Sequence, residues 1–193
     1  MSMMAEMKFF FGLQIHQSPY GIFINQSQYT LEILKKHGMN SCDSISTTMA
    51  IVRIDADLLG IPTDLRKYHS MIGGLMYLTT SQPDIAFAPL ICASYQACPM
   101  VKHLKEVKRI FRYLRKTYNM GLWYSKDSGF ELISYLDANH AGCHGDCKST
   151  SGGIQFLRDK LVSWSSKKQH CTTMSNTEAE ITRIMRRALV NSL

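Results

Sequence analysis

Two acidic residues in the last third of the chain could hold a divalent metal ion. Asp137 closes a mostly apolar run that is predicted to be a β-strand, and Glu180 lies where a helix is predicted to begin. A carboxylate on a strand and another on a nearby helix can share Mg²⁺ for the hydrolysis of a phosphodiester. Because Mg²⁺ prefers near-octahedral oxygen coordination, two carboxylates are an incomplete set. Alternatively, both residues are solvated carboxylates, for which the surface is the usual place.

A helix predicted from about Met100 to Thr117 carries a stripe of basic side chains. Its apolar residues recur at intervals of three and four, and the basic residues recur at the same spacing well around from them. Such a face could follow the phosphates of a nucleic acid duplex, and the formal net charge of +7 favours acidic partners, nucleic acid first. An ordinary solvated helix face is the alternative. The stripe consists of Lys102, Lys105, Arg109, Arg112 and Lys116.

A third group of residues could bind zinc. His140, Cys143, His144 and Cys147 lie close together in the sequence, and zinc favours four nitrogen and sulfur ligands. Their spacing is not that of a common zinc finger. A zinc-binding structural adaptor is therefore an alternative function.

Composition indicates a folded protein. With 193 residues and 45% hydrophobic content, the chain can form one ordinary domain or two small ones around a real core. The six cysteines are irregularly spaced and no signal-peptide pattern begins the chain, which predicts an intracellular protein, cytoplasmic or nuclear, and not a secreted one. No apolar run approaches the roughly 20 residues that span a bilayer, so no membrane partner is expected.

The predicted elements begin with a β-hairpin and continue with helices. Lys8–His16 and Ile22–Asn25 are rich in apolar and aromatic residues and are predicted strands. A helix is predicted from Ser27 to His37, followed by a connector without sustained periodicity. The later helical predictions are Asp64–Thr80, a short helix after Pro83, and the basic helix described above.

The remainder of the chain is predicted to be rich in strands. Candidate strands are Phe130–Asp137, Gly153–Leu157 and Leu161–Ser166, and a last helix is predicted from about Asn176. The chain is therefore predicted to be an α/β protein of the α+β kind, in which a β-hairpin and helices precede a mixed sheet with one helix.

Seven short motifs along the chain carry a resemblance to a known family. In order, they are Phe9-Phe-Phe-Gly-Leu-Gln-Ile15, Gly21-Ile-Phe-Ile-Asn25, Tyr68-His-Ser-Met-Ile-Gly-Gly-Leu75, Pro83-Asp-Ile85, Arg112-Tyr-Leu114, Gly121-Leu-Trp-Tyr124 and Lys148-Ser-Thr-Ser-Gly152. Together they resemble the Pol polyprotein of copia-type LTR retrotransposons over nearly the whole chain.

The resemblance implies a division into regions. Residues 1–40 would be the end of a reverse-transcriptase palm, with a primer-grip-like hairpin in which Phe11 and Gly12 contact nucleic acid. The regions that follow would be a connector at 41–62, thumb and connection helices at 63–120, and a truncated ribonuclease H-like domain, a partial mixed sheet, at 121–193.

The resemblance also implies catalytic roles. Asp137 matches the first catalytic aspartate of the family's ribonuclease H site and Glu180 matches its catalytic glutamate, so both are expected ligands of Mg²⁺. The chain departs from the family at Asn139, at Cys147 and over residues 181–187, and it lacks the family's later aspartates. It also lacks the polymerase Tyr-x-Asp-Asp motif, so polymerase activity is not expected.

The expected function is that of a truncated Pol fragment that binds an RNA–DNA hybrid, or another nucleic acid, without complete catalysis. The alternative within the same family is an active Mg²⁺-dependent ribonuclease H. The resemblance further implies a sheet without its later strands, and the exposed edge of such a sheet could allow self-association.

Overall fold

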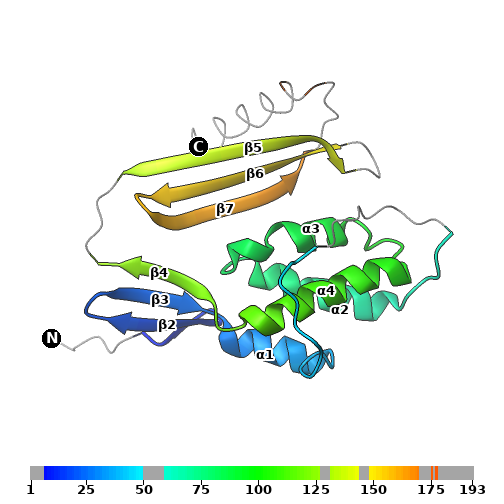
Figure 1. Cartoon of the computed structure of the whole chain (residues 1–193), viewed down its shortest axis with the longest axis horizontal. Coiled ribbons are helices and arrows are strands. Elements are labelled where there is room, and N and C mark those ends of the chain that lie inside the picture. The colour runs from blue at the N-terminus through cyan, green and yellow to red at the C-terminus, as the bar shows by residue number, and fades with distance from the viewer. Residues whose placement is uncertain are drawn as a thin grey trace. The chain divides into compact units, whose positions relative to one another are not determined.

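The computed structural model describes residues 7–49, 59–126, 131–143 and 148–169, together with Ser175 and Thr177. It contains helices and antiparallel sheets (Figure 1), which confirms the predicted α+β class. The chain forms two compact units, Met1–Gly129 and Phe130–Leu193, and each is described by itself. Among the described residues, no helix is long and apolar enough to cross a membrane.

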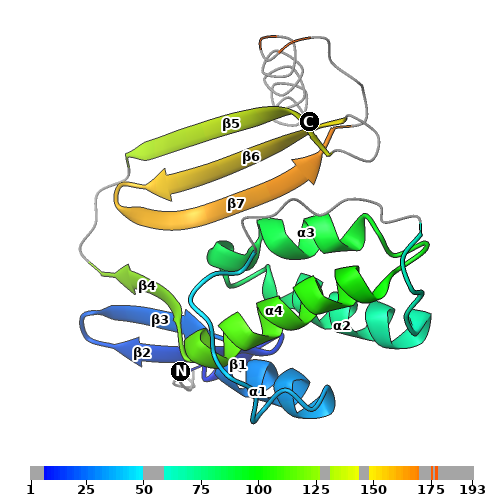
Figure 2. The ribbon, with the colours of Figure 1, turned by 45° about the vertical axis from the view of Figure 1, so that its right-hand side comes forward.

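The first unit contains a four-stranded antiparallel sheet in the order β1-β2-β3-β4 (Figure 2). Its strands are β1 (Phe9–Phe10), β2 (Leu13–Ser18), β3 (Gly21–Asn25) and β4 (Gly121–Ser125).

The prediction of a single strand over Lys8–His16 is wrong, because the chain reverses direction at Phe11 and Gly12 and β1 pairs with β2. Both turn residues have positive φ, 45° and 76°, which is the conformation that two-residue hairpin turns require. Only the glycine signals such a turn in the sequence.

The fourth strand shifts the boundary between the units. The resemblance places residues 121–193 in the second domain, but β4 pairs along its whole length with β3, from Gly21↔Ser125 to Asn25↔Gly121. The division falls instead after Gly129. The reason is that Leu122 and Trp123 complete a sheet that a hairpin alone leaves open on one side.

The helices of the first unit enclose its core. They are α1 (Ser27–Lys36), α2 (Leu65–Leu78), the 3₁₀ turn η1 (Pro83–Ile85), α3 (Phe87–Ala93) and α4 (Val101–Thr117). Asp64 caps α2, since its side chain accepts hydrogen bonds from the backbone N–H groups of Arg66 and Lys67. The apolar stripes of the helices meet in the core, whose fully buried members include Leu34, Tyr68, Ile72, Leu75, Val107, Phe111 and Leu114.

The second unit, in its described residues, is an antiparallel meander in the order β5-β6-β7 (Figure 1). Its strands, β5 (Leu132–Cys143), β6 (Lys148–Leu157) and β7 (Lys160–Lys168), are longer than predicted. No parallel pair occurs among these three strands, so the predicted mixed sheet is not seen in the described part of the chain. The helix predicted from Asn176 lies outside the described residues, apart from Thr177.

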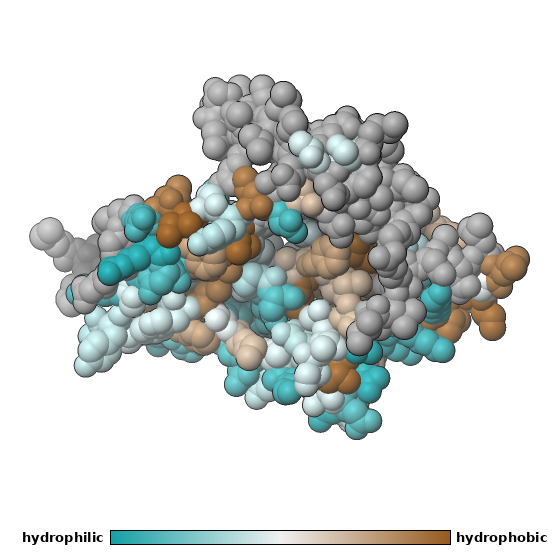
Figure 3. All heavy atoms as spheres, turned by 45° about the horizontal axis from the view of Figure 1, so that its top comes forward, coloured by the Kyte–Doolittle hydropathy of each residue, from teal (hydrophilic) through white to brown (hydrophobic). Residues whose placement is uncertain are grey.

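Several large apolar side chains remain at the surface, as the brown atoms in Figure 3 show. In the first unit they gather on the sheet, where Phe9 and Trp123 are about half exposed, and at the hairpin turn, where Phe11 is 82% exposed. These side chains lie on strands whose two faces are not both covered by the helices, which explains why a sequence rich in aromatic residues leaves some of them in solvent.

Gly121 is expected to be essential for the β3–β4 pairing. A Cβ atom there would lie 2.8 Å from the Asn25 Cβ and 2.9 Å from the Phe23 Cζ, and would contact the Ile24 carbonyl oxygen. We expect Gly121→Ala to lower the free energy of unfolding by about 1–3 kcal/mol, the usual effect of overpacking. Urea unfolding followed by circular dichroism measures it.

Gly73→Ala is the matched control for this measurement. A Cβ at Gly73 meets no atom within 4 Å, and alanine is preferred over glycine inside a helix, so this change should stabilise the chain by about 0.5–1 kcal/mol. Equal destabilisation by the two changes would contradict the role assigned to Gly121.

Candidate nucleic-acid interface

The basic stripe lies on α4, where a polar segment of the connector bonds to it. We call residues 43–47 the strap; Figure 2 shows this part of the chain running across α4. Arg109 Nη2 donates a hydrogen bond of 2.8 Å to Thr47 Oγ1, and Lys116 Nζ donates one of 3.0 Å to Ser46 Oγ. Two of the predicted phosphate-binding cations are therefore held by hydroxyl groups of the strap.

The backbone of the strap also bonds to α4. Arg112 Nε donates a hydrogen bond of 3.1 Å to the Asp43 carbonyl oxygen, and the Ile45 N–H donates one of 3.3 Å to the Arg112 carbonyl oxygen. Arg112 thus binds the strap through both its side chain and its backbone. The strap is fixed to the helix at several adjacent positions, so the side chains of Ser46 and Thr47 have defined places.

The acceptors of these three cations are all uncharged. Two are hydroxyl oxygens and one is a carbonyl oxygen, so the positive charges of Arg109, Arg112 and Lys116 are not neutralised by these partners. In addition, Arg109 Nε is buried, and no hydrogen-bond partner is found for it among the described residues. The helix face therefore retains positive charge and unused N–H groups.

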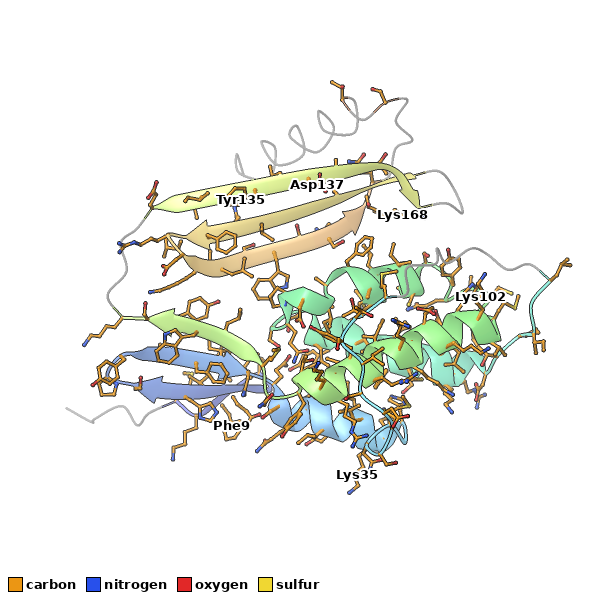
Figure 4. The ribbon with its side chains drawn as sticks, viewed as in Figure 1. Phe9, Lys35, Lys102, Tyr135, Asp137 and Lys168 are labelled. Atoms are coloured by element: carbon orange, nitrogen blue, oxygen red, sulfur yellow. The ribbon has the colours of Figure 1, made fainter. Side chains whose placement is uncertain are left out.

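The other two residues of the stripe lie nearer the N-terminus of α4. Lys105 is exposed, and Lys102, which Figure 4 labels, is half-buried. The stripe is thus continuous along the helix, but its C-terminal half is tied to the strap.

The predicted primer-grip residues form the tip of the β1–β2 hairpin. Phe11 takes φ 45°, an uncommon conformation for a residue other than glycine, and its side chain is exposed. The Phe10 ring packs edge-to-face against the Phe11 ring, with centroids 4.7 Å apart. The tip therefore presents an aromatic ring to solvent on a backbone that is conformationally strained.

A tyrosine of α2 holds this tip in place. Tyr77 Oη donates a hydrogen bond of 2.5 Å to the Phe11 carbonyl oxygen. Gly12 has a φ of 76°, which L side chains rarely adopt, and a Cβ atom there would also displace the same hydroxyl, so glycine is favoured at this position. The Tyr77 ring in turn packs edge-to-face on Tyr29, with centroids 4.7 Å apart. Burial, and to a lesser degree the neighbouring Tyr77, raise the pKa of Tyr29, so Tyr29 remains a neutral support for the tip.

The predicted catalytic aspartate lies on the other unit. Asp137 is an exposed residue of β5 (Figure 4). Its register partner is Gly152 on β6, which pairs with Ser166 on β7. Because Gly152 has no side chain, nothing from the neighbouring strand covers the carboxylate at that position.

The remaining predicted metal ligands are not described. Glu180 lies outside the described residues, as do His144 and Cys147 of the candidate zinc set and the side chains of His140 and Cys143. Within the described ranges there is no group of three or more His, Cys, Asp or Glu residues that could hold a metal ion. Of the two predicted Mg²⁺ ligands, only Asp137 lies among the described residues. One carboxylate does not fit a complete site, so we derive no metal-dependent step.

The hairpin tip and the basic stripe belong to the first unit, whereas Asp137 belongs to the second. Sequence reasoning missed Tyr77, Ser46 and Thr47, which position or contact the predicted residues. No local sequence pattern indicates their roles. Tyr77 is one of several aromatic residues in the predicted helices, and the strap has the composition of an ordinary polar connector.

Tyr77→Phe removes the hydrogen bond to the hairpin tip and keeps the ring. Because the bond is exposed, we expect a loss of about 0.5–1.5 kcal/mol in the free energy of unfolding. Tyr20→Phe is the matched control, since Tyr20 is 80% exposed and should leave stability unchanged. Urea denaturation of both variants measures the difference, and a Tyr77→Phe variant as stable as the unchanged chain would show that the hydroxyl does not hold the tip.

Comparison with known proteins finds Pol polyproteins of plant transposons among the relatives of the chain. The chain is 35% identical to the retrovirus-related Pol polyprotein from transposon RE1 of Arabidopsis thaliana over 176 residues, which cover 91% of the chain and 12% of the polyprotein. It is 33% identical to the Pol polyprotein from transposon RE2 of the same plant over 179 residues, again 91% of the chain and 12% of the polyprotein.

A third relative is of similar size to the chain. An uncharacterized mitochondrial protein of Arabidopsis thaliana is 33% identical over 172 residues, which cover 89% of the chain and 72% of that protein. The chain therefore spans about 12% of the length of the two polyproteins and most of the length of this third relative. No protein-family model matches the chain, and no solved structure matches it.

Proposed function

Because this chain belongs to the family of copia-type retrotransposon Pol proteins, we propose that its first unit binds an RNA–DNA hybrid and that the chain does not complete catalysis. The observation that carries the proposal is that three cations of α4 have only uncharged acceptors, which the strap supplies. Phosphate oxygens are charged and accept stronger hydrogen bonds than hydroxyl or carbonyl oxygens do. Arg109, Arg112 and Lys116 therefore have more to gain from a nucleic acid backbone than from their present partners alone.

The hairpin tip supports the same proposal. Phe11 is exposed and its backbone is held by Tyr77, so the backbone of the tip is already in place before any partner arrives. Aromatic side chains that stack on nucleic acid bases contribute about 1–3 kcal/mol per base. A tip whose backbone is already held loses less conformational freedom on binding than a free loop does, which favours a contact of this kind.

The second half of the proposal concerns catalysis. Asp137 has no described carboxylate partner, and Asn139 and Cys147 stand where the family has an aspartate and a basic residue. A single carboxylate holds Mg²⁺ weakly. The chain therefore retains contacts to the hybrid more readily than the chemistry that would cleave it.

Binding is tested by fluorescence anisotropy with a labelled RNA–DNA hybrid over a range of salt concentrations. We expect the logarithm of the association constant to fall linearly with the logarithm of the salt concentration, because each neutralised phosphate releases counterions. Lys105→Gln should weaken binding and reduce the magnitude of this slope by about 1, the change expected when one phosphate contact is lost.

Lys35→Gln is the matched control for this experiment. It removes the same charge from an exposed position in the last turn of α1 and should change the affinity and the slope less than Lys105→Gln does. Equal effects of the two variants would mean that net charge alone attracts the hybrid, and that α4 is not the interface.

Catalysis is tested by incubating the purified chain with a labelled hybrid and Mg²⁺. We expect no cleavage from a chain that circular dichroism shows to be folded. Asp137→Asn and, as a control, Asp159→Asn at the exposed β6–β7 turn accompany the unchanged chain. Cleavage that disappears only in Asp137→Asn would establish an active ribonuclease H and overturn this half of the proposal.

A further inference from the structure

The strap brings two hydroxyl groups to the basic face of α4. Ser46 and Thr47 are both exposed, and they are neighbours in the chain, with Cα atoms about 3.8 Å apart. Each hydroxyl oxygen accepts a hydrogen bond from a cation of α4. The strap and the helix therefore present two hydroxyls and two cations together at one surface.

Each hydroxyl retains a hydrogen-bond donor. A serine or threonine hydroxyl has one O–H and two acceptor lone pairs, and the bonds from Lys116 and Arg109 use only a lone pair of each. In the described part of the chain, no acceptor is found for the O–H of Ser46 or of Thr47. Both hydrogen atoms are therefore available to an outside acceptor.

The cations also retain donors on the same surface. A lysine ammonium has three N–H groups and an arginine guanidinium has five, whereas Lys116 and Arg109 each make one described side-chain bond. An oxygen atom placed beside the strap can thus accept from a hydroxyl and from a cation at once.

We propose that Ser46 and Thr47 of the strap, with Lys116 and Arg109 of α4, form a single phosphate-binding site for the backbone of the hybrid. Nucleic acid backbones are bound by arginine and lysine together with serine and threonine hydroxyls, which is the set found here. The hydroxyls fix the position of a phosphate, and the cations supply the charge. This inference rests on the proposed function, because it assigns the residues that receive the hybrid's phosphates.

A competing reading of the same contacts has the opposite consequence. If the hydroxyls only occupy the cations, the strap blocks the basic face and its removal frees Arg109 and Lys116 for phosphate. A phosphate-binding strap predicts weaker binding when the hydroxyls are removed, whereas a blocking strap predicts equal or tighter binding.

The experiment measures hybrid affinity and its salt dependence for Ser46→Ala, for Thr47→Val and for the double variant. Each hydrogen bond lost should weaken binding by about 2- to 10-fold. The slope of the logarithm of the association constant against the logarithm of the salt concentration should stay the same, since the cations remain in place. Arg109→Gln should differ from the hydroxyl variants, because it should also reduce the magnitude of this slope by about 1, the change expected for one lost phosphate contact.

Ser44→Ala is the matched control, because Ser44 is an exposed residue of the strap for which no side-chain bond to α4 is described. It should bind the hybrid as the unchanged chain does. Urea unfolding of all variants checks that the strap changes leave the first unit folded at the temperature of the assay.

The outcomes separate this inference from the proposed function. If the unchanged chain does not bind the hybrid, the proposed function fails, and the inference fails with it. If the unchanged chain binds but the folded double variant binds equally well or more tightly, the phosphate-binding strap alone is overturned. Weaker binding by the double variant with an unchanged slope, and normal binding by Ser44→Ala, would establish it.

Discussion

The amphipathic character of α4 is the constraint on which the first unit depends. One side of the helix places Val107, Phe111 and Leu114 in the core at essentially zero exposure, and burying such side chains contributes about 1.5–3 kcal/mol each. The other side cannot be buried, because it carries the basic stripe. The strap covers part of this side. Its uncharged oxygens accept hydrogen bonds from Arg109, Arg112 and Lys116, and they leave the positive charges of these side chains unneutralised. The same helix thus serves both the core and the proposed interface.

The hairpin tip is also held by a residue of the helices that form the core. The positive φ of Phe11 costs free energy, because a residue other than glycine disfavours the left-handed region. The hydroxyl of Tyr77, on a helix whose buried face includes Tyr68 and Leu75, fixes the tip from outside the strand. A rigid core therefore supports two exposed features, the tip and the strap, at positions that are distant in sequence.

The fold was largely predictable where the signals are local. The three-four periodicity of α2 and α4, the cap at Asp64 and the β-rich character of the later part of the chain all follow from neighbouring residues. The prediction failed where the local structure depends on residues that are distant in sequence. The reversal at Phe11–Gly12 lacks the usual Asn-Gly signal, and the assignment of β4 depends on its pairing with β3, about a hundred residues earlier in the chain. The candidate site divides in the same way, since the basic stripe is periodic and the strap is not.

By itself, the sequence determined the family, the α+β class and the presence of a helix with one apolar and one basic side. The family follows from the resemblance of short motifs along the chain, and the other two properties follow from residue types and from spacings of a few positions. Only the tertiary structure decided which groups meet the basic side. Lys116 lies 70 residues from Ser46, and Tyr77 lies 66 residues from Phe11. Contacts at such separations are set by how the core closes and not by a local pattern, because a hydroxyl in a polar segment or on a helix has many possible partners until packing selects one.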